Sequence, residues 1–405
     1  MNLGDGVHLT YCSNIHPGES WAEVRANFDR YVVAVRDRLR PAGDFGVGLR
    51  LSARAAAELA EPDALAEFKS FLARSGMYVF TLNGFPYGPF HGARVKEDVY
   101  LPDWRDPERL RYTNQLADLL LELLPADPTI EGSVSTVPGA YKPALGGAED
   151  VARMVEHLMR HVAHLVALRE RSGRLVTLAL EPEPHCFLET VAEAVVFFQA
   201  ELHGAAAVGR LMALTHLDAT AAARALRDHL GLCLDLCHAA VEFEEPADCL
   251  RQLRDAGIRV LKMQISAGLR LPRLAPAALR ALKRFDDPTY LHQVVQRGPA
   301  GLRRFADLPE AFGSLPEADT DTVTDTKLEW RVHFHVPIFL DRLEPFASTQ
   351  SFIREVLALH RASPVSAHLE VETYTWDVLP EPFRTGTVDA AVARELAWVR
   401  TELAA

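Results

Sequence analysis

Three segments of this chain end in side chains that can bind metals or transfer protons. Residues 178–184, 232–238 and 367–373 each begin as a short apolar run and stop at a carboxylate or an imidazole. A parallel strand that is buried on both faces reads as a continuous apolar run. A charge at its end is costly unless it is paired or bound to a metal. The three endings therefore predict strands that converge on one cation.

The elements that would position these side chains alternate along the chain. Long segments with helical spacing separate the strand-like segments, as parallel neighbours require because they are joined by long crossovers. Eight such units closing on themselves form an α/β (β/α)8 TIM barrel, which is the fold class that the sequence predicts. The eight predicted barrel strands are 7–11, 45–51, 78–83, 132–137, 175–180, 231–236, 258–265 and 367–373. A ninth strand candidate, 331–338, is surplus, and we expect it to lie outside the barrel.

An atypical region follows the seventh predicted strand. Residues 267–329 are rich in Pro, Arg and Asp. We expect this region to be an insertion over the mouth of a single barrel domain that spans residues 1–405. The length suits one barrel with insertions, since α/β barrels exceed 200 residues as one domain.

Composition excludes several classes of protein. The net charge of −12 argues against a nucleic-acid groove, which normally shows as a basic stripe. Five cysteines without a repeating spacing argue against a disulfide framework. No apolar run reaches about 18 residues, so we expect no membrane insertion. The start of the chain lacks a basic leader with an apolar run, which favours a cytoplasmic protein. The oligomeric state stays open, with a homo-oligomer as one option.

The active face of a TIM barrel lies at the carboxyl ends of its strands. The polar side chains at those places that we predict as metal ligands are Glu181, Asp235, His238, Gln264, His333, His335 and Glu372. Oxygen ligands with one or two imidazoles suit a divalent ion such as Mn, Mg, Co or Zn. Glu370 and Glu372 point the same way because side chains alternate along a strand, and Glu372 lies nearer the open face. One acid at a strand end is often a rim ion pair, but several on successive strands favour a metal site.

These motifs resemble those of the xylose isomerase-like superfamily. The sequence Glu181-Pro182-Glu183-Pro184 is similar to its Glu-Pro-Lys-Pro strand, in which the first Glu binds metal and the Lys contacts substrate. The resemblance covers most of residues 181–372 and implies a metal-dependent barrel enzyme that acts on a small sugar-like molecule. Glu183 in place of the Lys is a departure that argues against xylose isomerase activity itself.

The remaining ligand candidates follow the order of the superfamily. Asp235 and His238 form its acid-x-x-His, and Gln264 stands where a His or Asp ligand ends strand seven. His333-Phe334-His335 resembles the Asp-x-His pair of its two-metal members, and Glu372 matches the acid of the last strand.

Two further segments resemble one branch of this superfamily, the branch of the Ebo metabolite-traffic cluster. They are the Asn-Gly-Phe-Pro-Tyr-Gly-Pro-Phe-His segment at 83–91 and the Glu-Thr-Tyr-Thr-Trp segment at 372–376. The resemblance implies a role in processing or moving a small metabolite.

The chemistry open to such a site is proton transfer next to a carbonyl. A cation that holds adjacent oxygens of a hydroxy-ketone acidifies the C–H beside the carbonyl. Two carboxylates facing that carbon then give epimerisation or aldose–ketose isomerisation. The predicted catalytic residues are Glu181, Glu372, Glu183 and His238, with Phe85 and Phe90 as apolar walls. The predicted substrate-binding residues are His16, Asn83, Tyr87, His91, His185, Glu370, Tyr374 and Trp376.

Three function classes fit these features. The first is a divalent-metal-dependent sugar isomerase or epimerase, and the second is a non-catalytic barrel that binds and escorts a metabolite. A cation with an open coordination position favours the first over the second. The third is a metal hydrolase of the AP-endonuclease type, which the net negative charge disfavours because DNA binding relies on neutralising phosphates. A small molecule is thus the expected partner.

Overall fold

Eight parallel strands form a closed barrel in the computed structural model, which describes residues 1–90, 94–315, 327–377, 379–380, 384 and 386–405. The barrel strands are β2 (Val7–Tyr11), β3 (Phe45–Arg50), β4 (Met77–Asn83), β5 (Gly132–Thr136), β6 (Val176–Leu180), β7 (Leu230–Asp235), β8 (Arg259–Ile265) and β15 (His368–Val371). They pair in the order β2–β15–β8–β7–β6–β5–β4–β3, and β1 (Asn2–Gly4) adds to β2 antiparallel. The predicted TIM barrel is confirmed.

The barrel closes between its first two strands. The Thr10 hydroxyl of β2 donates to the Gly46 carbonyl at 2.8 Å and accepts from the Gly48 amide at 2.9 Å. Gly48 has a second role, because a Cβ built there would lie 2.0 Å from a carboxylate oxygen of Glu370. The missing side chain of Gly48 makes room for an acid inside the barrel.

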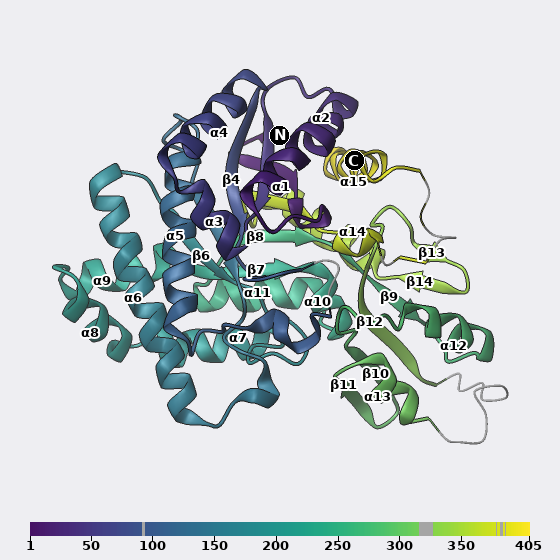
Figure 1. Ribbon diagram of the computed structural model, residues 1–405. Helices are drawn as coiled ribbons and strands as arrows, with labels where there is room; N and C mark the ends of the chain where they lie inside the picture. Colours follow the sequence, from purple (N-terminus) through teal and green to yellow (C-terminus); the bar gives the residue numbers. More distant parts are fainter. Residues whose placement is uncertain (91–93, 316–326, 378, 381–383, 385) are drawn as a thin grey trace.

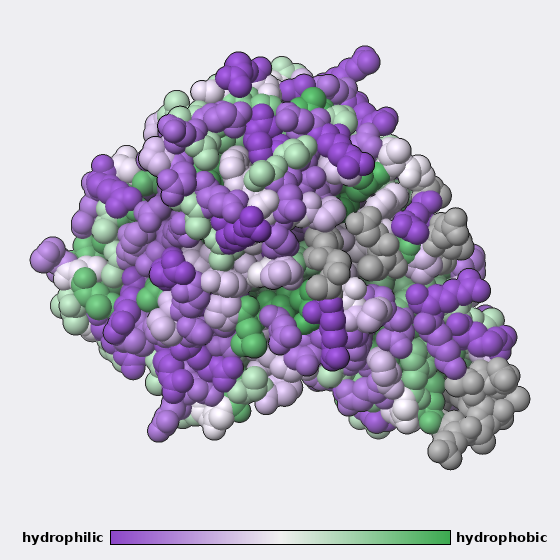
Figure 2. Space-filling model, viewed as in Figure 1, coloured by the Kyte–Doolittle hydropathy of each residue, from purple (hydrophilic) through white to green (hydrophobic). Residues whose placement is uncertain are grey.

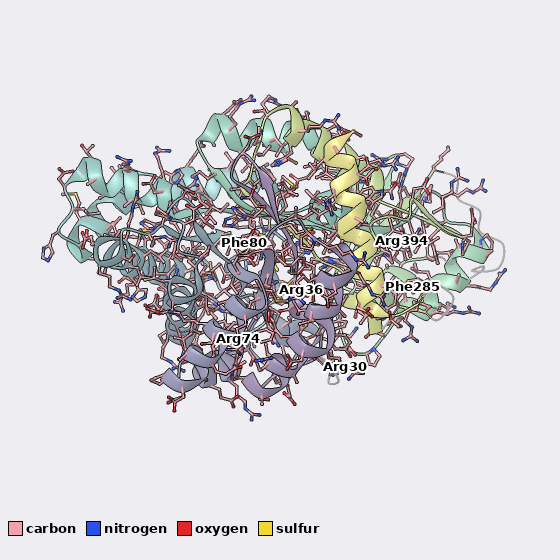
Figure 3. The ribbon with its side chains drawn as sticks, turned by 90° about the horizontal axis from the view of Figure 1, so that it is seen from above. Arg30, Arg36, Arg74, Phe80, Phe285 and Arg394 are labelled. Atoms are coloured by element: carbon pink, nitrogen blue, oxygen red, sulfur yellow. The ribbon has the colours of Figure 1, made fainter. Side chains whose placement is uncertain are left out.

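Helices surround the barrel, and their ends follow local sequence signals. Ser20 and Thr190 form capping boxes with Glu23 and Glu193, and Gly173 ends the longest helix in a left-handed conformation. The helices of this layer are α1 (Trp21–Asn27), α2 (Val33–Leu39), α3 (Ala53–Leu59), α4 (Pro62–Arg74), α5 (Pro107–Leu123), α6 (Ala148–Ser172), α7 (Val191–Phe197), α8 (Ala205–Leu214), α9 (Ala219–His229), α10 (Leu236–Val241), α11 (Pro246–Ala256), α14 (Gln350–Ala362) and α15 (Val388–Ala404). In Figure 3, α15 runs alongside α2, the helix that carries Arg36, so the last helix packs on the first helical unit.

A second sheet lies between β8 and α14 in the chain. Its strands are β9 (Ala267–Leu271), β10 (Val294–Gly298), β11 (Gly301–Phe305), β12 (Glu329–Val336), β13 (Arg342–Leu343) and β14 (Phe346–Ser348), with helices α12 (Pro276–Leu282) and α13 (Leu308–Gly313). All of its pairings are antiparallel, in the order β11–β10–β12–β9–β14–β13. Figure 1 shows this sheet on one side of the molecule, opposite α8 and α9.

The predicted insertion after the seventh barrel strand is therefore present, and the surplus strand β12 belongs to it. The second sheet continues past residue 329 to Ser348. Phe285, which Figure 3 labels, packs against Phe334 and Phe346 with ring centroids 4.9 and 5.3 Å apart. The inserted segment thus has apolar packing of its own.

The surface seen in Figure 2 is mainly hydrophilic, with hydrophobic residues scattered over it. Within the described residues, no single helix combines the length and apolar character needed to cross a membrane. One bent pair of helical segments, Val191–Leu202 with Ala205–Leu214, reaches that length and composition together. The five cysteines are buried and free.

Candidate metal centre

Three carboxylates meet at the carboxyl ends of β6, β7 and β15. Glu181 follows β6, Asp235 is the last residue of β7, and Glu372 follows β15. One carboxylate oxygen from each lies within 4.8 Å of those of the other two, and all three side chains are buried. The barrel thereby brings together acids that are far apart in the chain, as the sequence predicts for a shared cation.

Hydrogen bonds fix two of these acids and leave oxygens without partners. Glu372 Oε1 accepts from Asn14 Nδ2 at 2.8 Å and from Asn83 Nδ2 at 3.0 Å. Asp235 Oδ1 accepts from the His238 backbone amide at 2.9 Å, which makes Asp235 the N-cap of α10. Among the described residues, Asp235 Oδ2 and Glu181 Oε2 are buried with no hydrogen-bond partner. Orphaned buried oxygens of this kind are costly unless they coordinate an ion.

Three imidazoles adjoin the carboxylates, and each is oriented through Nδ1. His238 Nδ1 lies 2.9 Å from the Pro182 carbonyl, and His335 Nδ1 lies 2.8 Å from the Glu372 carbonyl. A carbonyl only accepts, so in both rings Nδ1 carries the proton and Nε2 presents a lone pair. Anchoring of the second ring nitrogen to a carbonyl is typical of histidines that bind metals. His335 Nε2 is buried without a hydrogen-bond partner among the described residues.

The third imidazole, His333, makes a close nitrogen–nitrogen contact with His238. Its Nδ1 lies 2.8 Å from Gln293 Oε1, and its Nε2 lies 3.0 Å from His238 Nε2. Gln293 Nε2 faces acceptors, among them Glu183 Oε1 at 3.2 Å, so Oε1 is the end that faces His333. Two lone pairs therefore point at each other unless one ring is protonated. Zinc bound tetrahedrally at its usual Zn–N distance separates two ligand nitrogens by about 3.3 Å, close to the spacing found here.

The electrostatics of the cluster also favour a bound cation. Burial, followed by repulsion from Asp235, raises the pKa of Glu181 well above its usual value. Burial and then the Glu181 carboxylate raise the pKa of Glu372 in the same way. Burial also tends to raise the pKa of Asp235, but the His238 and His335 side chains together with hydrogen bonds from the His238 amide and the Ser266 hydroxyl outweigh it, and the pKa of Asp235 is lowered. Burial lowers the pKa of His335 to about 4, which keeps the ring neutral and able to bind a metal.

A pocket opens onto this cluster. Its empty volume is about 520 Å³, including the part open to solvent. The predicted site residues that line it are Asn83, Phe85, Phe90, Glu181, Glu183, His238, His333, Glu372 and Tyr374. Asp235 and His335 lie behind the lining and join its members in the possible ligand groups.

Two predicted residues lie inside the barrel instead of in the pocket. Glu370 was predicted to bind substrate, but its fully buried carboxylate pairs with Lys262 Nζ at 2.6 Å. Gln264 is level with Asp235 and Glu370 in the strand register. Its Oε1 accepts from Cys233 Sγ at 3.1 Å, and its Nε2 is buried without a partner among the described residues. Both side chains point into the barrel core because they alternate with residues that face the helices.

Other predicted substrate contacts lie around the pocket without lining it. His16 stacks on Tyr31, with ring centroids 4.4 Å apart. The Tyr87 hydroxyl donates to Glu108 on α5. His185 adopts a positive φ of 65° and Trp376 is buried, but neither is part of the described pocket lining. His91 lies outside the described residues.

Several residues of the site have no counterpart in the sequence prediction. Asn14 follows β2, so the rule of polar residues after barrel strands could have found it. The Tyr100 hydroxyl donates to Glu183 Oε1 at 2.7 Å, and Gln293 Nε2 donates to the same oxygen at 3.2 Å. Tyr290 lines the pocket next to them. Tyr100 ends a short 3-10 helix after β4, and Gln293 and Tyr290 belong to the insertion, so no strand pattern marks these three residues.

Comparisons with known proteins give distant likenesses among solved structures. No family model and no curated protein matches the chain. Among solved structures it resembles AsbF, involved in petrobactin synthesis, from Bacillus anthracis, at 11% identity and TM-score 0.46 over 96% of this chain and 98% of that one. The IolI protein with a bound zinc atom gives 12% identity and TM-score 0.46 over 98% of both chains. A xylose isomerase domain protein from Alicyclobacillus acidocaldarius gives 13% identity and TM-score 0.44 over 98% of both chains.

TM-scores this low carry no argument about activity. The assignment as a TIM barrel rests on the strand order and closure of the chain itself. What the chain does must be argued from the geometry of its site.

Proposed function

We propose that this protein is a divalent-metal-dependent isomerase or epimerase of the xylose isomerase-like superfamily, acting on a small polyhydroxylated metabolite. The observation that carries the proposal is the meeting of Glu181, Asp235 and Glu372 oxygens within 4.8 Å at the barrel mouth. Two of these acids present buried oxygens that have no hydrogen-bond partner among the described residues. Mn, Mg, Co and Zn all accept such ligands.

The carboxylates would hold the cation, with His238 and His335 as neighbouring nitrogen ligands. Bound there, it would supply Lewis-acid polarisation of a substrate carbonyl. His333 and Glu183 form a further possible ligand group with His238, so the number of cations is one or two.

The reaction that these residues support is removal and return of a proton beside the carbonyl. Glu181 and Glu372 both line the pocket, so each carboxylate can take a proton from a bound ligand and return it. Asn14 and Asn83 hold Glu372 in one orientation. Such positioning is what an acid–base pair needs on the two sides of one carbon.

The two segments that resemble the Ebo metabolite-traffic branch also contribute to the pocket. Asn83, Phe85, Phe90, Glu372 and Tyr374 line it. This placement supports a finer proposal, that the substrate is a metabolite processed in that cluster. The same residues are compatible with an escort role, which the absence of turnover would favour.

Elemental analysis of the purified protein tests the metal. We expect at least one equivalent of a divalent metal in the wild type and its loss in Asp235→Ala, with an unchanged far-UV spectrum. Glu355→Gln, on the exposed face of α14, is the matched control and retains the metal. A metal-free wild type that also fails to bind added Mn or Zn contradicts the proposal.

Turnover is tested separately by solvent exchange. The metal-loaded protein is incubated in D2O with ketoses, aldoses and cyclic polyol ketones, and deuterium uptake is followed by mass spectrometry. Incorporation at the carbon beside the carbonyl, lost in Glu181→Gln, supports isomerase chemistry. Metal and ligand binding without exchange points to the escort role.

A further inference from the structure

The charges that line the pocket are mostly negative. Glu181, Glu183 and Glu372 line it, and Asp235 lies directly behind. With one divalent cation bound, four ionised carboxylates would keep a net negative charge. No arginine belongs to the pocket lining that the structure describes. Recognition of a phosphate or carboxylate normally uses Arg, Lys or the N-terminus of a helix.

The lysine in the described lining is already neutralised. Lys96 Nζ lies 2.7 Å from Asp307 Oδ2 and 3.1 Å from the Asp287 carbonyl. Its side chain is 12% exposed, so the ion pair is largely shielded from solvent. The pair joins the segment after β4 to the insertion, and it leaves no unpaired positive charge for an anionic ligand.

Glu183 contributes a carboxylate, which can only accept hydrogen bonds when ionised, to the lining of the pocket. Among the described residues, Glu183 Oε1 accepts hydrogen bonds from the Tyr100 hydroxyl and from Gln293 Nε2. The second oxygen, Oε2, remains as an acceptor for a donor in the pocket. A substrate hydroxyl provides such a donor, whereas a phosphate at this place would meet a like charge. Like charges in a desolvated contact are strongly unfavourable.

Part of the pocket lining is aromatic. Phe90, Tyr290 and Tyr374 form a triangle of rings whose centroids are 5.2 to 5.4 Å apart. They come from the loop after β4, the insertion and the turn after β15. Flat apolar walls suit the C–H face of a ring-shaped ligand, while the polar side presents aimed oxygens and nitrogens.

From these features we infer that the pocket selects a neutral, ring-shaped polyol and rejects its phosphorylated form. The inference rests on the proposed function, since it concerns the ligand of the same site. Glu183 acts as the residue that determines this specificity: its carboxylate accepts from a hydroxyl and repels an anion. The aromatic triangle covers the apolar face of the ring.

Ligand-observed NMR with zinc-loaded protein tests the inference. The probes are matched pairs: D-fructose with D-fructose 6-phosphate, D-glucose with D-glucose 6-phosphate, and myo-inositol with myo-inositol 1-phosphate. We expect the neutral members that bind to do so at least about tenfold more tightly than their phosphates. A phosphate that binds as tightly as its neutral partner, or a panel without any neutral binder, overturns the inference.

Glu183→Gln separates the charge of this residue from its shape. The amide keeps an acceptor oxygen, so we expect neutral ligands to stay within about threefold while the preference over phosphates falls several-fold. Glu355→Gln is the control and keeps the full preference. An unchanged preference in Glu183→Gln overturns the role assigned to Glu183.

Metal content is measured on each sample, which keeps the two proposals distinguishable. A protein that binds zinc but prefers phosphorylated ligands overturns the inference on substrate charge and leaves the metal centre standing. A protein that binds no zinc contradicts the proposed function itself.

Discussion

Removing Lys262 from the barrel interior isolates one buried negative charge. Its Nζ lies 2.6 Å from Glu370 Oε1, and both side chains are fully buried. Lys262→Met leaves the Glu370 carboxylate without its cation. Breaking a buried ion pair from one side costs about 3–5 kcal/mol, because an uncompensated charge stays in the core. We expect Lys262→Met to lower the unfolding free energy by that amount at pH 7.

A double-mutant cycle separates the lost pair from lost packing. Lys262→Met combined with Glu370→Met removes both charges while keeping similar volumes. Replacing a whole buried pair by apolar side chains is often neutral or stabilising. We therefore expect the double variant to recover most of the loss, with a coupling energy of at least about 2 kcal/mol.

Urea unfolding followed by circular dichroism measures these differences between pH 5 and pH 8. Burial already raises the pKa of Glu370, and Lys262 lowers it in the wild type. Without Lys262 the pKa of Glu370 in the folded state rises further. The destabilisation of Lys262→Met therefore grows as pH increases and shrinks as pH falls. A Lys262→Met variant within about 1 kcal/mol of the wild type at pH 7 would refute the reasoning. So would a double variant that is less stable than Lys262→Met.

Three further predictions concern the site and the last helix. Asn83→Ala removes a 3.0 Å hydrogen bond to Glu372 Oε1. We expect titration calorimetry to show a metal affinity about 10- to 100-fold weaker, and an unchanged affinity would contradict the role of Asn83 in positioning Glu372. Burial raises the pKa of Glu395 to about 7, so its contribution to stability is full below the unfolded pKa and is lost as pH rises through 7. Glu395→Gln keeps an acceptor for the Ile338 amide and the Thr373 hydroxyl. We expect the unfolding free energy of this variant, relative to the wild type, to increase between pH 5 and pH 8 by on the order of 2 kcal/mol. A difference between variant and wild type that does not change with pH contradicts the raised pKa of Glu395. A chelator should lower the melting temperature and added Zn restore it, because the cation binds the folded state; a melting temperature unaffected by both would count against the site.

The barrel and its acidic rim were predictable because both depend on local patterns. Apolar runs mark the buried parallel strands, and the residue at which each run stops marks the carboxyl end. Glu181, Asp235 and Glu372 were found in this way, and the structure places them together. The Asp-x-x-His spacing also has a local cause, since Asp235 caps the short helix that carries His238.

The sequence of the last strand did not reveal which of its two acids lies in the barrel core and which lies in the pocket. Glu370 and Glu372 share a face, but only Glu372 reaches the pocket. The sequence did contain a signal, because Lys262 stands between apolar residues in the middle of its strand. A lysine in such a strand needs a buried acid, and Glu370 is that partner.

The pocket residues that the insertion supplies could not all be predicted from local sequence patterns. His333 was identified through its alternation with His335, whereas Tyr290 and Gln293 lie in irregular sequence. Their positions depend on how the second sheet packs on the barrel, which is a long-range property. Lys96 and Asp307, which pair across that junction, are 211 residues apart in the chain.

Anomalous X-ray diffraction from crystals grown with Zn or Mn tests the metal centre most directly. We expect an anomalous peak within bonding distance, about 2.0–2.3 Å, of oxygens from Glu181, Asp235 and Glu372. Density that is absent from this cluster, or a metal bound only at other residues, would contradict the proposed metal centre.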